Sequence, residues 1–336
     1  MSATPLLRVT GLRKFFPVRG GLFGRKVADV QAVDGISFEV ARGETLGIVG
    51  ESGCGKSTTA RLLVRLVEPD EGEIIFDGLG LGDGMTLSEL RRQAQMVFQD
   101  SYASLNPRLA VGDSIAFGPR VHGMKASEAR ALAQELLRKV GLDPALFAGR
   151  YPHELSGGQR QRVNIARALA LRPRLIILDE AVSALDKSVE AQVLNLLGDL
   201  KAELGLTYVF ISHDLDVVRF MSDRVMVMYL GKVVEIGDVE SIYADPRHPY
   251  TAALLSAMPS ADPDRRTEEA PLAGDPPNPI DPPPGCRFHT RCPFAQDPCR
   301  RAEPGLNPAG DRRQVACHVN DPSSGHSRAG RQGEAA

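Results

Sequence analysis

Three short apolar runs along the chain predict buried β-strands. They lie at residues 45–49, 174–180 and 208–214, and each is nearly continuous in hydrophobic residues rather than alternating with polar ones. Strands of this kind are covered on both faces, as in parallel sheets flanked by helices. Apolar residues at helical spacing predict helices at 57–67, 127–140 and 188–204. Strand and helix therefore alternate, which is typical of an α/β fold.

The pattern also predicts how the chain is organised. Residues 1 to about 98 carry strand signals, about 100–165 are helical, and 170–235 return to strand and helix alternation. A boundary is predicted at Pro259, because the next 25 residues are rich in proline and favour an extended, sparsely packed linker. Residues 320–336 are small and polar, and we expect them to be disordered.

Length and charge limit the function classes. With 336 residues and 43% hydrophobic residues, the chain has room for one large domain and an appendage. A formal net charge of −2 gives no general attraction to nucleic acid. No stretch reaches 18 to 20 apolar residues, and residues 1–20 lack the form of a signal peptide. We expect a cytosolic protein that reaches a membrane only through a partner.

A glycine-rich segment follows the first predicted strand. It fits G-x-x-x-x-G-K-[ST] and consists of Gly50, Glu51, Ser52, Gly53, Cys54, Gly55, Lys56, Ser57 and Thr58. In such loops the backbone N–H groups surround phosphate, the lysine reaches the terminal phosphates and the hydroxyl binds Mg²⁺. A strand before the segment and a helix after it support this interpretation over an ordinary glycine turn.

A second motif separates this chain from other phosphate-loop proteins. It reads Leu-Ser-Gly-Gly-Gln at 155–159 and is followed by the basic helical run 160–169. With the phosphate loop, it resembles the nucleotide-binding subunits of ABC transporters over about residues 6–258. The resemblance implies that Ser156, Gly157, Gly158 and Gln159 close over ATP held by a second subunit. By itself the motif also fits a helix start, because serine is a good N-cap.

Two carboxylates end the strand at 174–180. Asp179 is expected to help hold Mg²⁺, and Glu180 is the better candidate for the base that activates water. Such a base must contact the water rather than the metal. Paired acids at a strand end are otherwise often just solvated.

The resemblance assigns three more polar residues to the nucleotide site. His213 matches the family's switch histidine, and Gln99 matches the glutamine that senses Mg²⁺ and water. Asp186 matches the loop residue that communicates across the dimer, although it also suits a helix cap. The adenine is expected to stack on Phe16, with Phe15 as the competing ring.

Two segments resemble the ATPases of bacterial dipeptide and oligopeptide importers. These are residues 245–255, which contain His-Pro-Tyr-Thr, and residues 102–108, which follow Gln99. Cys54, where other loops carry serine, resembles the second of the two ATPases that these importers use. The family also includes nickel and glutathione importers.

Four of the five cysteines lie close together in the C-terminal part, at Cys286, Cys292, Cys299 and Cys317. In a cytosolic protein this clustering favours metal over disulfides. Four thiolates suit a [4Fe–4S] cluster, which some resembling importer ATPases carry. Zinc and unliganded buried thiols remain alternatives, and His289 and His318 are possible substitute ligands.

The resulting prediction is a P-loop NTPase of RecA-like α/β fold, with antiparallel β and helical subdomains over residues 6–258. A Pro-rich, Cys-containing extension over 259–319 follows. The implied function is ATP hydrolysis that energises peptide import at the cytoplasmic face of the membrane. Implied partners are a second ATPase subunit, two permease subunits and, indirectly, an extracellular solute-binding protein. A soluble ABC ATPase acting on DNA or ribosomes and a redox or metal sensor are the other classes considered.

Overall fold

The computed structural model describes residues 4–20, 24–258, 274–310 and 312–330, and these form two compact units. Both units are discontinuous in sequence. One comprises residues 4–7, 40–45 and 75–212, and the other comprises the described parts of 8–39, 46–74 and 213–330. No helix among the described residues is long and apolar enough to cross a membrane.

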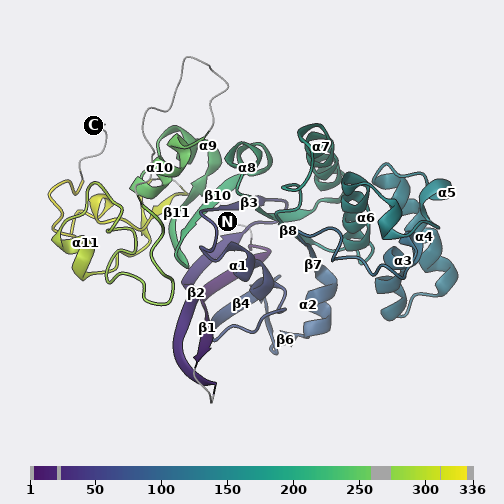
Figure 1. The fold of residues 1–336 in the computed structure, drawn as a ribbon, viewed down its shortest axis with the longest axis horizontal. Helices are drawn as coiled ribbons and strands as arrows, with labels where there is room; N and C mark the ends of the chain where they lie inside the picture. The colour runs from purple at the N-terminus through teal and green to yellow at the C-terminus, as the bar shows by residue number, and fades with distance from the viewer. Residues whose placement is uncertain (1–3, 21–23, 259–273, 311, 331–336) are drawn as a thin grey trace. The chain divides into compact units, whose positions relative to one another are not determined.

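The first unit combines a parallel sheet with a lobe of helices. Strands β7 (Ala94–Val97), β8 (Leu175–Asp179) and β9 (Thr207–Ile211) run parallel in that order. Every residue of β8 and β9 is buried, as their continuous apolar pattern predicted. Helices α3 (Val111–Val121), α4 (Ala126–Lys139), α5 (Pro144–Phe147) and α6 (Gly157–Leu169) pack on one another and gather together in Figure 1. The other elements of this unit are β5 (Leu79–Leu81), β6 (Gly84–Met85), α2 (Leu87–Gln93), a 3₁₀ turn (Pro152–Glu154) and α7 (Lys187–Leu204).

The second unit contains the glycine-rich loop and the C-terminal region. Strand β3 (Thr45–Val49) pairs in parallel with β10 (Arg224–Tyr229), which pairs antiparallel with β11 (Lys232–Asp238). Two short strands from the C-terminal region, β13 (Gln314–Val315) and β12 (Asn307–Pro308), continue this sheet. Its other elements are β1 (Leu7–Gly20), β2 (Arg25–Val40), α1 (Lys56–Leu63), β4 (Glu71–Phe76), α8 (Leu215–Met221), α9 (Val239–Ala244), α10 (Pro249–Ser256), α11 (Asp297–Arg301) and a 3₁₀ turn (His318–Asn320).

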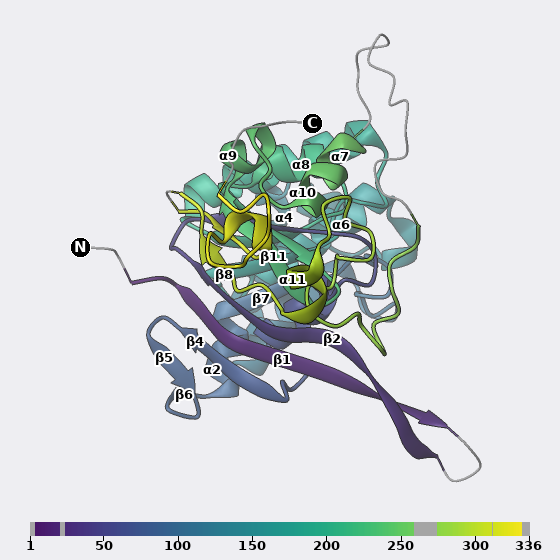
Figure 2. The ribbon, with the colours of Figure 1, turned by 90° about the vertical axis from the view of Figure 1, so that its left-hand side faces the viewer.

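Strands β1 and β2 run side by side as a long hairpin (Figure 2). The apolar part of β2 covers only residues 31–40, and a glycine-rich basic run precedes it in the sequence. In the structure β2 starts at Arg25, because backbone pairing with β1 extends the strand beyond its apolar part. The predicted helix 57–67 ends earlier, at Leu63: Arg65 adopts a positive φ of 54° and Leu66 is exposed.

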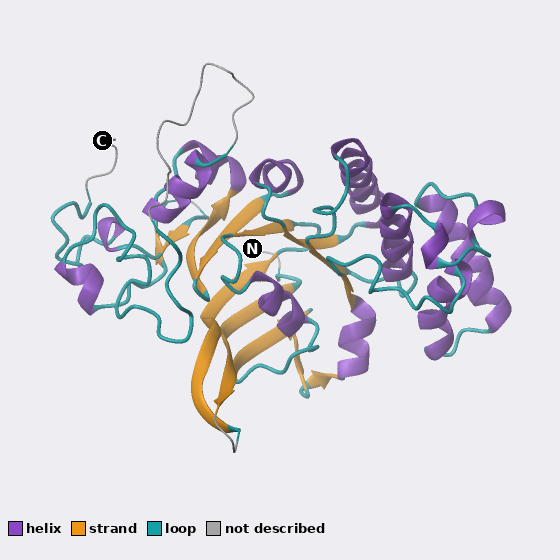
Figure 3. Ribbon diagram, in the orientation of Figure 1, coloured by secondary structure: helices purple, strands orange, loops and turns teal. Residues whose placement is uncertain are grey.

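Residues 274–310 and 312–330 consist mainly of loop (Figure 3), yet they are held by specific contacts. The Pro279 carbonyl accepts a hydrogen bond from the Gln31 amide at 3.0 Å. His326 is buried, and its Nε2 lies 2.8 Å from the Phe294 carbonyl oxygen. Residues 276–284 and 320–330 are thus tied to other residues at individual points, while 259–273 and 331–336 lie outside the described residues.

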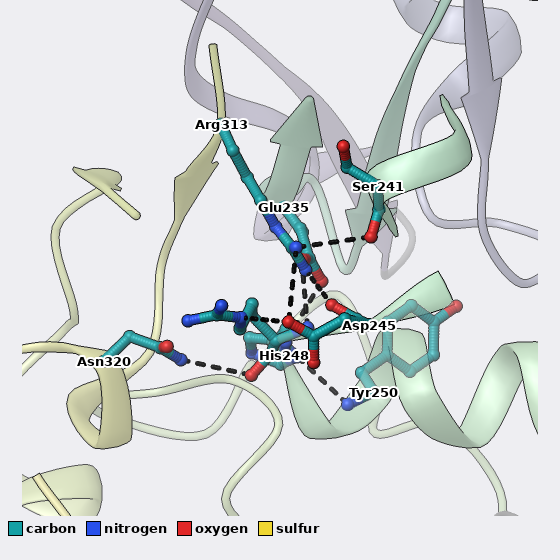
Figure 4. Close-up of polar contacts among 8 residues, drawn as sticks. Glu235, Ser241, Asp245, His248, Tyr250, Arg313 and Asn320 are labelled. Carbon is teal, nitrogen blue, oxygen red and sulfur yellow. Dashed lines mark hydrogen bonds and ion pairs between the residues drawn. The ribbon is translucent and has the colours of Figure 1, made fainter. Parts of the chain in front are cut away.

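A buried ion pair joins the C-terminal region to β11. Glu235 is fully buried, and Arg313, also buried, donates to its Oε1 from Nε at 3.0 Å and from a second guanidinium nitrogen (Figure 4). The backbone amides of Arg247 and His248 donate to the same carboxylate at 3.1 and 3.0 Å. Burial lowers the pKa of His248 to about 3, and its Nδ1 accepts from the Tyr250 amide. The network therefore fixes the start of α10 on the sheet.

Removing the cation from this pair should be costly, because Glu235 would stay buried without its charged partner. We predict that Arg313→Met lowers the free energy of unfolding by about 3–5 kcal/mol. Arg312→Met is the matched control, because Arg312 is exposed and lies 3.6 Å from Asp238. It should lower stability by at most about 1 kcal/mol. Urea denaturation measures both, and equal losses would contradict the role given to the buried pair.

Helix α6 approaches α7 so closely that one glycine leaves no room for a methyl group. A Cβ on Gly158 would lie 2.4 Å from Cγ1 of Val189, whereas one on Gly157 would meet Leu185 at an ordinary 3.5 Å. We predict that Gly158→Ala destabilises the protein by about 1–3 kcal/mol. Gly157→Ala, the control, should be neutral or stabilising, because alanine favours helix. Thermal unfolding distinguishes them, and adding Val189→Ala to Gly158→Ala should restore stability. Equal stability of the two single variants would show that the close approach of Val189 to Gly158 does not exclude a methyl group at position 158.

Candidate functional site

The glycine-rich loop folds back around the side chain of Lys56. That side chain is buried, and its Nζ donates to the carbonyl oxygens of Gly50 and Glu51 at 2.7 and 3.0 Å. Gly50 has a φ of 145°, and a Cβ there would lie 2.2 Å from the Met228 carbonyl oxygen. Only glycine allows this path. The loop thus presents a cation at the start of α1, the arrangement that binds a phosphate group.

The remaining predicted residues of this loop have different exposures. Ser57 and Thr58 are half-buried in the first turn of α1, and Cys54 is buried. Burial raises the pKa of the Cys54 thiol, which therefore stays protonated at neutral pH. Ser52 and Gly53 are exposed. The hydroxyls of the first turn are therefore accessible beside the lysine.

The two candidate rings for adenine differ in exposure. Phe16 is exposed, with the Lys14 ammonium 5.7 Å from its ring centre, whereas Phe15 is half-buried beside Arg13. Neighbouring residues of a strand point to opposite faces, so only one of these rings can face a given ligand. Their exposures favour Phe16.

The C-terminal region contacts the glycine-rich loop directly, which the sequence analysis missed. A pocket of about 230 Å³ is lined by residues 51–54 of the loop and by residues 276–279 of the proline-rich segment. The Arg291 guanidinium pairs with the Glu51 carboxylate, and the Tyr250 hydroxyl accepts from the Glu51 amide. More than 190 positions separate the partners in each contact, so no sequence spacing could reveal them.

In the first unit, Gln99 and Glu180 meet. The Gln99 Nε2 donates to Glu180 Oε2 at 2.9 Å. Glu180 directly follows β8 and has a φ of 48°, a left-handed conformation unusual for glutamate. Strained backbone of this kind often occurs at functional sites. Asp179, the last residue of β8, is buried.

The serine of the Leu-Ser-Gly-Gly-Gln motif starts a helix. Ser156 Oγ accepts from the Gln159 amide at 3.3 Å, and Gln159 Oε1 accepts from the Ser156 amide at 2.9 Å. This capping box fixes the N-terminus of α6, and Ser156 remains exposed there. Asp186 precedes α7 and is exposed, but its side chain makes no capping bond.

Helix α6 also anchors the segment that follows Gln99. The Asn164 amide donates to the Ser101 carbonyl oxygen at 3.1 Å, and the Arg167 guanidinium donates to that of Ser104. The Arg160 guanidinium lies 5.5 Å from the ring centre of Tyr102. The motif helix and the segment after Gln99 therefore form one packed assembly.

His213 is exposed in the second unit, two residues before α8. The next residue, Asp214, caps that helix by accepting from the Asp216 and Val217 amides at 3.1 and 3.2 Å. The cap fixes the direction in which the chain leaves His213.

The pKa of the Cys286 thiol is raised to about 12, chiefly by burial and additionally by the nearby thiols of Cys317, Cys299 and Cys292. Burial likewise raises the pKa of Cys317 to about 11. Among the described residues, however, no group of three or more His, Cys, Asp or Glu side chains is arranged to hold a metal ion. The predicted iron–sulfur cluster therefore has no support among the described residues.

Two family models match the chain. A model described as ABC transporter covers residues 33–183, and one described as oligopeptide/dipeptide transporter, C-terminal region, covers 234–299.

Several curated relatives are similar along nearly the whole length. A probable peptide ABC transporter ATP-binding protein y4tS of Sinorhizobium fredii is 53% identical over 95% of this chain and 91% of its own. The oligopeptide transport ATP-binding protein AppF of Bacillus subtilis is 52% identical over 94% and 97%. The dipeptide transport ATP-binding protein DppF of Haemophilus influenzae is 51% identical over 94% and 98%.

Solved structures agree with these matches. CbiO1 of Clostridium perfringens, part of the ABC transporter complex cbiONQ, superposes with a TM-score of 0.61 at 30% identity, covering 71% of this chain and 91% of its own. The ATP-binding cassette MJ0796, bound to ADP and Pi in a dimeric post-hydrolysis state, gives 0.59 at 30% identity over 69% and 98%. The chain belongs to the ABC transporter family, as an ATP-binding subunit that carries the C-terminal region of oligopeptide/dipeptide transporters.

Proposed function

We propose that this chain hydrolyses ATP to energise the import of peptides through separate permease subunits at the cytoplasmic face of the membrane. One observation carries the proposal: a phosphate-binding loop and a peptide-transporter C-terminal region occur in the same unit of the structure. Relatives named for peptide, oligopeptide and dipeptide transport support the choice of substrate.

In this proposal the phosphates of ATP bind at the loop 50–58. Lys56 leaves its backbone acceptors, Gly50 and Glu51, and donates to the terminal phosphates instead. Exchanging carbonyl partners for phosphate oxygens keeps the buried ammonium satisfied throughout. Adenine stacks on Phe16, the more exposed of the two candidate rings.

The hydroxyl of Ser57, the carboxylate of Asp179 and the side-chain oxygen of Gln99 are hard oxygen donors, which suit Mg²⁺. When bound, Mg²⁺ neutralises charge on the phosphates. The base is Glu180, which Gln99 orients through the 2.9 Å hydrogen bond, so that the carboxylate accepts a proton from water. His213 completes this assignment as a hydrogen-bonding partner of the γ-phosphate.

The motif at 155–159 implies a second ATPase subunit. Ser156 is exposed at the N-terminus of α6, where amides and the positive end of the helix favour an anion. We propose that the anion is the γ-phosphate of ATP on a related, different ATPase chain, with Asp186 at the same junction. Two permease subunits and an extracellular solute-binding protein complete the transporter.

The iron–sulfur cluster at the four cysteines stays a prediction without a role in hydrolysis. Iron and acid-labile sulfide analysis of protein purified without oxygen tests it directly.

The first functional prediction separates chemistry from binding. Glu180→Gln should reduce ATP turnover by at least about 100-fold, because the amide cannot accept a proton, while ATP affinity is retained. Lys56→Ala should instead weaken ATP binding itself. Turnover and nucleotide affinity are measured on the purified proteins. Near wild-type turnover of Glu180→Gln would reject this residue as the base.

The role in transport is tested in cells that lack the chromosomal gene. Wild-type protein should restore uptake of a labelled dipeptide or oligopeptide, and Glu180→Gln should not. ATPase activity without any restored peptide uptake would keep the enzyme assignment and overturn the peptide substrate.

A substitution at Ser156 tests the shared site. Ser156→Arg places a bulky side chain where the partner's γ-phosphate would lie, so it should impair hydrolysis at the partner's site. ATP binding by the mutant chain itself should be unchanged, because its own loop is intact. Sizing chromatography and ATPase assay of mixtures with the partner ATPase measure the first effect, and nucleotide titration of the mutant chain alone measures the second. Loss of ATP binding by the Ser156→Arg chain would contradict the proposal.

A further inference from the structure

The phosphate-binding loop carries a carboxylate that a distant cation neutralises. The Arg291 guanidinium donates to Glu51 twice, from NH1 to Oε2 at 2.7 Å and from NH2 to Oε1 at 3.0 Å. The Arg291 side chain is only 5% exposed and that of Glu51 23% exposed. The hydrogen bonds that Arg291 donates to the Glu51 carboxylate hold the pKa of Arg291 above its usual value. A bidentate, largely buried pair of this kind is both strong and specific in geometry.

The backbone of Glu51 is held from the same side. Its amide donates to the Tyr250 hydroxyl at 2.8 Å, and Tyr250 is fully buried. The Tyr250 ring packs against those of Tyr229 and Phe288, with centres 4.7 and 5.5 Å apart. The Arg291 guanidinium lies 5.9 Å from the Tyr229 ring centre. The side chain and the backbone of Glu51 are therefore held by Arg291 and Tyr250, which both lie within residues 234–299, the part that matches the C-terminal region of oligopeptide/dipeptide transporters.

The charge of Glu51 opposes the proposed ligand. ATP brings several negative charges to a loop that already contains this carboxylate, and like charges at short range repel strongly where water is partly excluded. The Lys56 ammonium donates to backbone carbonyl oxygens of Gly50 and Glu51. Arg291 is the cation that the structure pairs with the Glu51 carboxylate.

We propose that Arg291 is a positioning residue for ATP binding: it neutralises Glu51 and holds the phosphate loop in its binding shape from outside the ABC domain. The inference rests on the proposed function and extends it, because it makes the C-terminal region a determinant of nucleotide affinity. It also gives a reason why residues 234–299, which match oligopeptide/dipeptide transporters, and the phosphate-binding loop belong to one compact unit.

The test compares three variants of the full chain with wild type. Arg291→Met keeps most of the side-chain volume and removes the charge, so Kd and KM for Mg·ATP should rise about tenfold while kcat changes less than about twofold. Adding Glu51→Gln should recover most of the lost affinity, because the uncompensated charge is gone. Arg301→Met is the control: Arg301 forms an exposed pair with Asp297 in the same region and should match wild type.

The possible results distinguish failure of the Arg291 inference from failure of the proposed function. Unchanged KM in Arg291→Met, or no recovery in the double variant, would overturn the inference while wild-type ATP binding keeps the proposed function. A wild-type chain that binds no ATP would overturn the proposed function itself. Should Arg291→Met not fold, Arg291→Lys keeps the charge without the bidentate geometry, and its KM should lie within about threefold of wild type. A tenfold rise in KM for Arg291→Lys would contradict the proposal that the positive charge at position 291 acts by neutralising Glu51.

Discussion

The structure depends on the close packing of the glycine-rich loop against the neighbouring strand β10. Gly50 approaches the Met228 carbonyl so closely that any Cβ would overlap it, and its φ of 145° is open to glycine alone. This packing determines where the loop turns, and hence where Lys56 begins α1. The Gly231 amide donates to the Cys54 carbonyl oxygen at 2.9 Å and holds the far side of the loop. Nucleotide binding and the contacts of the C-terminal region both follow from this position.

A consequence is that the C-terminal region is part of the nucleotide-binding unit rather than an appendage. Arg287 donates to Gln31 at 2.6 Å and to Asp34 at 2.5 Å, and Lys232 lies 2.9 Å from the same Asp34 carboxylate. The cationic partners lower the pKa of Asp34 against the effect of its burial. The Glu235–Arg313 pair makes a second buried connection. Folding of residues 274–330 is thereby coupled to the sheet that carries the phosphate loop.

The sequence predicted the parts of the fold that local pattern determines. Strands at 45–49, 175–179 and 207–211 and the helix at 187–204 were identified because apolar periodicity and burial agree there. Where tertiary contacts override local pattern, prediction differed from structure. The polar half of β2 is a strand because β1 pairs with it, and the prolines at 276–279 line a pocket together with the loop although their composition favours a free linker.

The candidate site likewise combines residues that local spacing indicates with residues that only the folded chain brings together. Motif residues such as Lys56, Ser156 and Glu180 could be proposed as site residues from the sequence alone, because their types and spacing suggest the chemistry. The contact of Gln99 with Glu180 spans 81 positions and that of Arg291 with Glu51 spans 240. Such pairs depend on the whole fold, and an arginine beside a cysteine has no local signal that assigns it to a phosphate loop.

The central claim is that this chain binds Mg·ATP at the loop 50–58, with the C-terminal region as part of the same unit. Amide hydrogen exchange of the intact protein, with and without Mg·ATP, tests it most directly. The account predicts slower exchange on nucleotide addition in peptides covering residues 50–58, accompanied by slower exchange in the peptide that contains Arg291. Unchanged exchange at the loop, with nucleotide bound at saturating concentration, would contradict the account.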